Sequence, residues 1–333
     1  MTILIVTDAW HPQVNGVVTT LTKTSEVLED WGYKVKVISP DDFRTIPCPT
    51  YPEIRLSCVT PGKIRALLLR TNPDAVHIVT EGPLGWTARS ACLKENIPFT
   101  TSYHTRFPEY IRLRLPVPLS WSYAVVRRFH HAAAGTMAAP TIIDELNRRG
   151  FRHLVPWSRG VDTGLFRPYQ EDCYNGPRPV FLYTGRVAVE KNLTSFLDLD
   201  LPGSKVVIGD GPDRQSLSKR YPEVLFTGAK KGEDLARHMA SADVFVFPSL
   251  TDTFGVVMLE AMACGLPVAA YPVTGPNYLI KNGVNGFIDS DLQKAALQAL
   301  KIGPSQCRLF ARKYSWQGST DQFVNNLAWR GQL

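Results

Sequence analysis

Short apolar runs of strand length alternate with helical stretches along this chain, and the alternation occurs twice. The strand candidates are residues 3–7, 34–39, 75–79 and 99–103, then 180–184, 205–208, 224–226, 244–247 and 267–270. Helical stretches separate many of them, for example at about 17–31 and 84–95. This pattern predicts an α/β fold with parallel strands in doubly wound sheets. A chain of 333 residues is too long for one ordinary core, so we expect two such domains.

The predicted boundary lies near residues 167–179, where Pro168, Gly176, Pro177 and Pro179 interrupt regular structure among polar residues. We therefore expect a first domain at 1–167 and a second at 168–314. Ligands of open α/β sheets bind outside the carboxyl ends of the strands. Two such domains facing each other would form a cleft, and the motifs described next all follow predicted strands.

Composition excludes several protein classes. Hydrophobic residues make up 44% and charged residues 20%, which is typical of a globular protein. No apolar run approaches the ~20 residues that span a bilayer. The N-terminus has no basic stretch followed by a cleavage site, so it reads as a buried strand and we expect a cytoplasmic protein. The six cysteines are scattered without metal-ligand spacing, and we expect reduced thiols and no bound metal.

The net charge of +7 has a local peak at residues 106–131. Arginines outnumber the single acidic residue there, Glu109, and they alternate with aromatic and aliphatic residues; they are Arg106, Arg112, Arg114, Arg127 and Arg128. Such a segment can dock on an anionic membrane surface, and the protein would then be peripheral on the inner face. Equally, it can be an ordinary loop and helix that packs its aromatic residues inward. No nucleic-acid-binding module is recognisable, so we expect no nucleic-acid partner.

The residues that best indicate chemistry lie at 248–265. Asp252 and Glu260 are eight positions apart, so a carboxylate before a helix and one within it can face the same cleft. The backbone N–H groups of Thr253, Phe254 and Gly255 lie where the helix is expected to begin, unpaired and partly positive. This combination suits a polyhydroxylated, anionic ligand such as a sugar nucleotide.

Four further candidates follow other predicted strands. Arg186 and Lys191 lie five positions apart on a glycine-led loop and can clamp a diphosphate. Gly16 opens the first helix and allows close approach of a phosphate or sugar. His104 directly follows the strand at 99–103. In contrast, Asp198-Leu199-Asp200 looks like a metal motif but has no nearby third ligand, and we expect no metal there.

These motifs, in this order, resemble those of the retaining glycosyltransferases of family four, which have the two-domain GT-B fold. The family pattern is Glu, seven residues, Glu, then Ala-Met-Ala-x-Gly-x-Pro-Val. Here Asp252 is followed after seven residues by Glu260 and then by Ala-Met-Ala-Cys-Gly-Leu-Pro-Val. The first carboxylate is therefore one methylene shorter, a variation associated with some lipid-glycosylating members. The family also places a last helix back on the first domain, and residues 315–333 match it.

The resemblance assigns roles to the candidate residues. Arg186 and Lys191 would hold the diphosphate and neutralise the departing nucleotide, and Gly16 would approach it. His104 and Asp252 would hold the donor sugar, and Glu260 would accept hydrogen bonds from the ribose. Gly211 lies in a Gly-x-Gly-Pro turn that the family places beside the nucleotide. The nucleotide sugar would be a substrate, with no metal or other cofactor required.

The resemblance implies transfer of a hexose, with retention, from a nucleotide diphosphate sugar to an acceptor hydroxyl. We favour a UDP-hexose donor and a membrane lipid acceptor such as diacylglycerol. An alternative is a GDP-mannose-dependent α-mannosyltransferase acting on a lipid or polysaccharide precursor, and a sugar-nucleotide epimerase is a weaker one. The base, the sugar, the acceptor and the oligomeric state stay open at this point.

Overall fold

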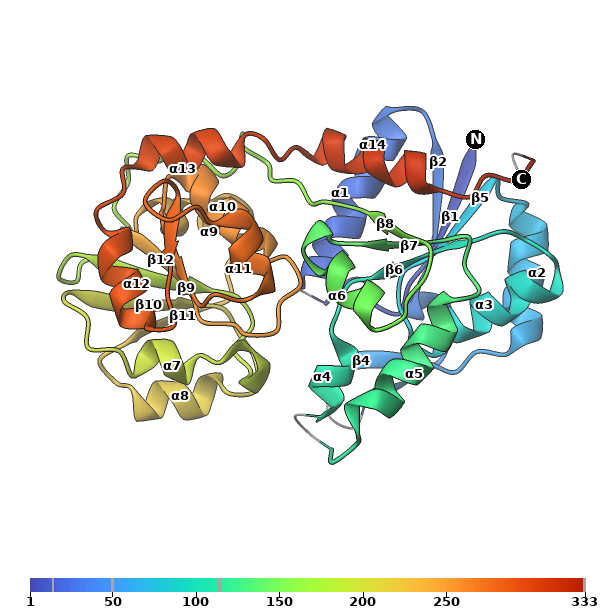
Figure 1. The fold of residues 1–333 in the computed structure, drawn as a ribbon, viewed down its shortest axis with the longest axis horizontal. Coiled ribbons are helices and arrows are strands. Elements are labelled where there is room, and N and C mark those ends of the chain that lie inside the picture. The colour runs from blue at the N-terminus through green and yellow to red at the C-terminus, as the bar shows by residue number, and fades with distance from the viewer. Residues whose placement is uncertain (14, 49–50, 113–114, 332–333) are drawn as a thin grey trace. The chain divides into compact units, whose positions relative to one another are not determined.

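The computed structural model describes residues 1–13, 15–48, 51–112 and 115–331 of the chain. The chain divides into two compact units. The first comprises Met1–Ser158 and the chain from Trp316 onward, and the second comprises Arg159–Ser315. Within the described ranges each unit has a parallel sheet of six strands, with helices packed on it (Figure 1).

The first unit has the strand order β2-β1-β5-β6-β7-β8, and all neighbouring strands are parallel. These strands are β1 (Thr2–Val6), β2 (Lys34–Ile38), β5 (Ala75–Ile78), β6 (Thr100–Tyr103), β7 (Gly135–Ala138) and β8 (Leu154–Pro156). Successive side chains of a strand point to opposite faces, and β1 serves two cores in this way. Leu4 and Val6 belong to one buried cluster, and Ile3 and Ile5 to the other.

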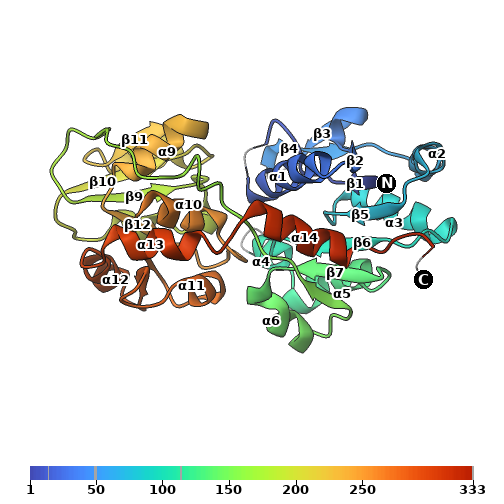
Figure 2. The same ribbon diagram turned by 90° about the horizontal axis from the view of Figure 1, so that it is seen from above.

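Helices cover both faces of this sheet. The cluster of Leu4 and Val6 includes residues of α2 (Pro61–Thr71), α3 (Pro83–Lys94) and α5 (Leu119–His130). The opposite cluster includes residues of α1 (Gly16–Asp30) and α14 (Trp316–Asn326), which lie side by side (Figures 1 and 2). The remaining elements are η1 (Pro40–Asp42), α4 (Phe107–Arg112), η2 (Pro140–Ile142), α6 (Ile143–Arg148) and the antiparallel hairpin of β3 (Thr45–Cys48) and β4 (Tyr51–Ser57).

The second unit has the strand order β11-β10-β9-β12-β13-β14, again all parallel. Its strands are β9 (Val180–Thr184), β10 (Ser204–Ile208), β11 (Leu225–Gly228), β12 (Val244–Phe247), β13 (Val268–Ala270) and β14 (Gly286–Ile288). Its helices are η3 (Val189–Lys191), α7 (Thr194–Leu197), α8 (Arg214–Arg220), α9 (Gly232–Ala240), α10 (Val256–Cys264), α11 (Thr274–Leu279), α12 (Leu292–Ala299) and α13 (Pro304–Ala311). One core packs Phe181 and Val246 against α7 and α12.

The predicted α/β fold with two doubly wound parallel sheets is confirmed. The units divide between Ser158 and Arg159, however, earlier than the predicted boundary at 167/168. Residues 159–167, which were expected in the first domain, pack on the second unit instead. The Val161 amide donates to the Tyr314 carbonyl at 3.1 Å, and Val161 and Phe166 are buried.

The chain returns to the first unit at Trp316, close to the predicted position. Helix α14 ends at Asn326, before the predicted segment 315–333 ends. Phe323 of this helix is fully buried, and the Trp157 indole donates to the Ser319 carbonyl at 3.1 Å. Strands β7, β8 and β14 and the β3–β4 hairpin were not predicted. They are only three to seven residues long, and β7 reads Gly-Thr-Met-Ala, without a clear apolar run.

Candidate functional site

The strand order of the second unit reverses between β9 and β12. From β9 the chain builds outward to β10 and β11 on one side, and it then crosses to β12, β13 and β14 on the other. Open α/β sheets bind ligands outside the carboxyl ends of the strands at such a reversal. The loop after β9 carries Arg186 and Lys191, and the loop after β12 carries Asp252. Three of the predicted residues therefore meet at the point where a ligand is expected.

These two loops are joined by side-chain contacts. Lys191 Nζ lies 2.6 Å from Asp252 Oδ1, and both side chains are 19% exposed. Asn192 Nδ2 donates to the Pro248 carbonyl at 3.1 Å, and the Thr251 hydroxyl donates to the Glu190 carbonyl at 3.3 Å. Asn192 and Thr251 were not predicted. Asn192 directly follows Lys191 and Thr251 directly precedes Asp252, and this adjacency was the one sign in the sequence that they belong to the same site.

Arg186 is held by its own loop. The Tyr183 hydroxyl donates to the Arg186 carbonyl at 2.8 Å, and Arg186 Nε lies 4.0 Å from the buried carboxylate of Glu190. Burial lowers the pKa of the guanidinium, while the charges of Glu190 and Asp213 oppose this shift. An arginine stays charged after such a shift. A planar, half-buried cation therefore lies on the same loop as the lysine, after β9, which suits a diphosphate.

Three glycines, which have no side chain, lie in or next to this loop. Gly185, Gly209 and Gly211 have φ values of +152°, +149° and +157°, which other residues rarely adopt. A Cβ on Gly209 would lie 1.8 Å from the Gly185 carbonyl oxygen, and one on Gly211 would lie 2.3 Å from that of Val187. The predicted turn at Gly211 therefore packs directly on the loop of Arg186 and exposes backbone where a flat ligand could approach.

Helix α10 begins just after Asp252. Its N-cap is Gly255, with φ of +83°, and no side chain caps its first amide groups. This φ lies in the left-handed region and favours glycine, whereas the contact of a Cβ with Met258 Cε, at 2.6 Å, involves only the movable end of a flexible side chain. Phe254 is buried, and Thr253 lies beside it in the loop. The expected amide donors thus belong to the approach and first turn of α10.

Glu260 lies on α10 with its carboxyl group in a poorly solvated position. Burial raises its pKa to about 7. Among the described residues, no hydrogen bond or ion pair to its carboxyl group is found. A carboxyl group that is half-buried and has no partner is less stable in its charged form than one in open water. Its placement is therefore typical of a group that binds a ligand.

The first unit contains the other two predicted residues, Gly16 and His104. Gly16 is the first residue of α1, and apart from its chain neighbours and its own helix backbone, no atom of the described residues lies within 4 Å of where its Cβ would be. The Asn15 carboxamide caps this helix, and its oxygen accepts from the Val17 and Val18 amides at 3.0 Å each. A phosphate at this helix would therefore compete with Asn15. His104 directly follows β6, with its ring 5.4 Å from that of Trp157.

Asp8 is an organising residue that the sequence did not single out. It follows β1, and its carboxylate accepts from the amides of Leu84 and Gly85 at 2.9 and 3.1 Å and from the Thr80 hydroxyl at 2.9 Å. Burial raises its pKa, against the effect of these hydrogen bonds. Asp8 joins the loops after β1 and β5, where the strand order of this unit reverses. Both oxygens of the Asp8 carboxylate accept hydrogen bonds from within the protein, so the role of Asp8 is structural.

Two arginines of residues 106–131 are engaged within the protein, one of them in an ion pair. Arg106 is ion-paired with Glu145 at 2.6 Å, and Arg127 donates to the Arg149 carbonyl at 2.8 Å. Arg112 and Arg128 are exposed, while residues 113–114, with Arg114, lie outside the described residues, as does residue 14. The exposed side chains of this segment include apolar ones, namely Ile111 (37%), Leu115 (52%), Trp121 (70%) and Val125 (57%).

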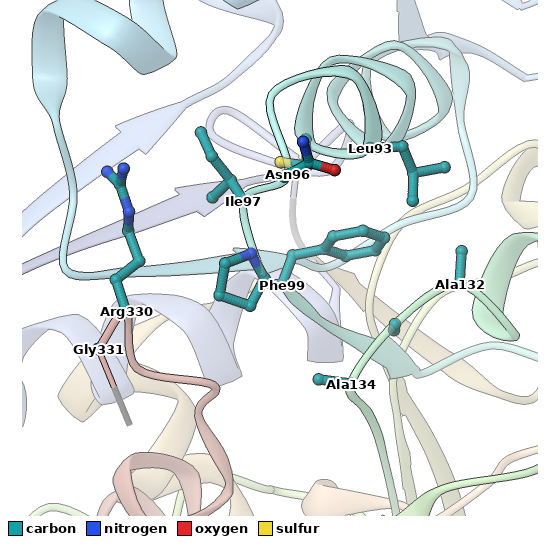
Figure 3. Close-up of a pocket in the computed structure, with 11 residues that line it drawn as sticks. Leu93, Asn96, Ile97, Phe99, Ala132, Ala134, Arg330 and Gly331 are labelled. Atoms are coloured by element: carbon teal, nitrogen blue, oxygen red, sulfur yellow. The ribbon is translucent and has the colours of Figure 1, made fainter. Parts of the chain in front are cut away.

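Two other features lie away from these residues. A cavity of about 590 Å³ lies at the amino ends of β6 and β7 and is lined by Asn96, Phe99, Ala134 and Arg330 among others (Figure 3). It is on the opposite edge of the sheet from His104. Over the described ranges, no group of His, Cys, Asp and Glu side chains is arranged to hold a metal ion. Asp198, from the Asp-x-Asp sequence, accepts a hydrogen bond from Tyr221.

No helix in the described ranges has the length and apolarity needed to cross a bilayer.

Comparison with known proteins gives matches along most of the chain. The family described as Glycosyltransferase Family 4 matches residues 14–165, and that described as Glycosyl transferases group 1 matches residues 178–302.

Among individual proteins, the chain is similar to a GDP-mannose-dependent alpha-mannosyltransferase of Mycobacterium tuberculosis. They are 31% identical over 314 residues, which cover 86% of this chain and 83% of the relative. An alpha-monoglucosyldiacylglycerol synthase of Streptococcus pneumoniae is 27% identical over 356 residues, covering 91% and 79%. The solved structure of sucrose-phosphate synthase from Thermosynechococcus elongatus matches with a TM-score of 0.73 at 18% identity, over 97% of each chain. The chain therefore belongs to glycosyltransferase family four, with the GT-B fold, and it transfers a sugar from a nucleotide-sugar donor.

Proposed function

We propose that this protein is a retaining, metal-independent hexosyltransferase that uses a UDP-hexose donor and a lipid acceptor such as diacylglycerol. The observation that carries the proposal is the pairing of Lys191 with Asp252 at the strand-order reversal of the second unit, 2.6 Å apart. It brings a cation suited to a diphosphate next to a carboxylate suited to sugar hydroxyls.

Each candidate residue has a role in this reaction. Arg186 and Lys191 stabilise the charge that builds on the departing diphosphate, which lowers the barrier electrostatically. Glu260 accepts from the ribose hydroxyls, and His104 and Asp252 orient the sugar. The acceptor hydroxyl attacks from the face that the diphosphate leaves, and a departing phosphate oxygen takes its proton. The protein thus contributes positioning and charge stabilisation, and no protein nucleophile takes part.

A lipid acceptor is supported by the outer face of α5. Trp121 and Val125, one helical turn apart, are 70% and 57% exposed, and the exposed Arg128 follows on the same face. Aromatic and aliphatic groups beside a guanidinium suit a shallow attachment to an anionic bilayer. The relative named alpha-monoglucosyldiacylglycerol synthase supports glucose and diacylglycerol as sugar and acceptor. The protein would then act as a peripheral membrane enzyme.

A second candidate is α-mannosyl transfer from GDP-mannose. It is favoured by the relative of that name, which is more similar to this chain than the synthase is, at 31% against 27% identity. The two candidates share the same site and differ in the base and the sugar.

A ligand screen followed by a transfer assay tests the proposal. UDP, GDP, ADP and their hexose derivatives are added in turn, and a bound nucleotide should raise the melting temperature by mass action. The best donor is then incubated with diacylglycerol vesicles, and the glycolipid and the configuration of its new bond are analysed. Lys191→Ala and Glu260→Ala should each lower turnover at least tenfold while the fold persists.

Several results would count against the proposal. Near-normal transfer by both variants would contradict the site. Selective binding of GDP-mannose would favour the second candidate, and conversion of the donor without any acceptor would indicate an epimerase. Transfer abolished by EDTA and restored by a divalent ion would contradict metal independence.

A further inference from the structure

We propose that Asp252 competes with the donor diphosphate for Lys191, so that the site binds an intact nucleotide sugar but releases the free nucleoside diphosphate. This inference rests on the proposed function and adds a cause for product release. The ion pair between Lys191 and Asp252 breaks when the donor binds and forms again when the product leaves. Lys191 leaves the carboxylate for the diphosphate, and Asp252 accepts hydrogen bonds from the sugar hydroxyls instead.

The charges around the diphosphate-binding loop support the competition. Each of its two candidate cations already lies beside a carboxylate, Arg186 at 4.0 Å from Glu190 and Lys191 at 2.6 Å from Asp252. Both members of the second pair are about four-fifths buried, so water screens their charges only partly. A diphosphate brought to Lys191 would therefore be placed close to the Asp252 carboxylate. One ammonium group in a poorly solvated site cannot pair fully with both anions, so the diphosphate has to displace the carboxylate from Lys191.

The second oxygen of Asp252 is the feature that points to the sugar. Asp252 Oδ2 is buried and, among the described residues, has no hydrogen-bond partner, whereas Oδ1 is taken by Lys191. A buried carboxylate that loses Lys191 would have neither oxygen satisfied, which is unfavourable. Hydroxyl groups of a bound hexose would supply the missing donors. A nucleoside diphosphate without its sugar would not.

The site thus distinguishes donor from product by what Asp252 gains. With the intact donor, the diphosphate takes Lys191 and the sugar satisfies Asp252. After transfer the sugar has left, and re-formation of the ion pair favours departure of the diphosphate. Asp252 is a binding residue in the proposed function, and here it acquires a second role as a competitor.

Isothermal titration calorimetry with UDP and GDP tests this role, because neither ligand carries a sugar. The Asp252→Asn variant keeps the shape of the side chain and removes its charge. We expect it to bind the preferred nucleoside diphosphate at least fivefold more tightly than the wild type, while its turnover with the sugar donor falls at least tenfold. A role in sugar contact alone would leave the affinity for the diphosphate unchanged.

Two further variants sharpen the test. Asp172→Asn is a matched control, because Asp172 also lies 2.6 Å from a cation, that of Arg178. Asp172 precedes β9, on the side of the amino ends of the strands, and so is away from the proposed site. This substitution should leave the affinity unchanged. In a Lys191→Gln background, the gain from Asp252→Asn should shrink to less than twofold, because there is no lysine left to compete for.

Three outcomes would overturn the inference. Equal or weaker diphosphate binding by Asp252→Asn would show that the carboxylate does not compete. A full gain in the Lys191→Gln background would indicate plain repulsion without exchange. Both results leave the proposed function standing. If the wild type binds neither nucleoside diphosphates nor their sugars, the proposed function fails and the inference fails with it.

Discussion

The ionisation of Glu260 makes the free energy of unfolding depend on pH. Its pKa in the folded protein is about 7, above the value of about 4.5 for an unperturbed glutamate. Between these values the carboxyl group ionises in the unfolded state but stays protonated in the folded state. The unfolded state is then favoured increasingly as pH rises from about 4.5 to about 7, and above that the effect is constant.

Removing this carboxyl group should stabilise the protein at neutral and alkaline pH. The shift corresponds to at most about 3 kcal/mol, and we expect about 1–2 kcal/mol because the side chain keeps some access to water. Glu260→Gln should therefore melt at a higher temperature than the wild type at pH 8 and at the same temperature near pH 4.5. Thermal unfolding from pH 4.5 to 8 measures this, with the exposed Glu29→Gln as control. A pH-independent difference would contradict the assigned cause.

Substitution of Gly16 tests whether a ligand contacts the backbone at this position, without disturbing the fold. A Cβ there meets no atom within 4 Å, so Gly16→Ala should fold normally and melt at an unchanged or slightly higher temperature. If a phosphate or sugar contacts the backbone at this point, the affinity for the donor should fall at least tenfold. Gly303→Ala is the control, since Gly303 is equally open and precedes α13. Unchanged donor binding by Gly16→Ala would remove Gly16 from the site.

Arg186, Lys191 and Asp252 were predicted because their types and spacing suit a diphosphate and hydroxyl groups. The structure places all three at the strand-order reversal of the second unit. Their pairing was not predicted, because the distance between two loops far apart in sequence depends on strand order. The capping of α1 by Asn15 was missed for a related reason, since a side chain that could bind a ligand can also bind its own backbone.

Among the elements, helix α5 shows most clearly why burial decides the meaning of a sequence pattern. Arginines alternate with aromatic residues there, and the sequence allowed both a basic membrane surface and an inward-packed helix. In the structure Tyr123 and Phe129 are buried while Trp121 and Val125 are exposed, so one face of the helix packs inward and the other faces solvent. Arg106 and Arg127 bind partners within the protein, which leaves an outer face more apolar than basic.

This outer face predicts binding to lipid vesicles. The Trp121→Ser/Val125→Ser double variant should lose at least fivefold in sedimentation with vesicles of phosphatidylglycerol and diacylglycerol. Its melting temperature should change little, because both side chains are mostly exposed. Leu309→Ser is a matched control, as Leu309 is 59% exposed on α13 of the second unit. Equal sedimentation of the double variant and the wild type would contradict attachment through α5.

At the scale of the whole molecule, apolar runs were sufficient to predict the fold class and the central strands. Strands 180–184 and 244–247 were predicted with the observed ends, because both are continuous apolar runs buried on both faces. The division between the units was placed too late. Proline and glycine mark irregular backbone, but they do not show on which unit that backbone packs. The contact of the Val161 amide with the Tyr314 carbonyl assigns residues 159–167 to the second unit, and it joins positions about 150 residues apart in the sequence.

The placement of α14 has a consequence for how the chain matures. The core that contains Ile3 and Ile5 is completed by Phe323 and Leu327, which are made more than 300 residues later. Residues 159–315 between them form a continuous unit with its own sheet. On the ribosome, the middle of the protein can therefore reach its native state first. The amino-terminal part must wait, with one side of its sheet incompletely covered, until Phe323 and Leu327 have been made.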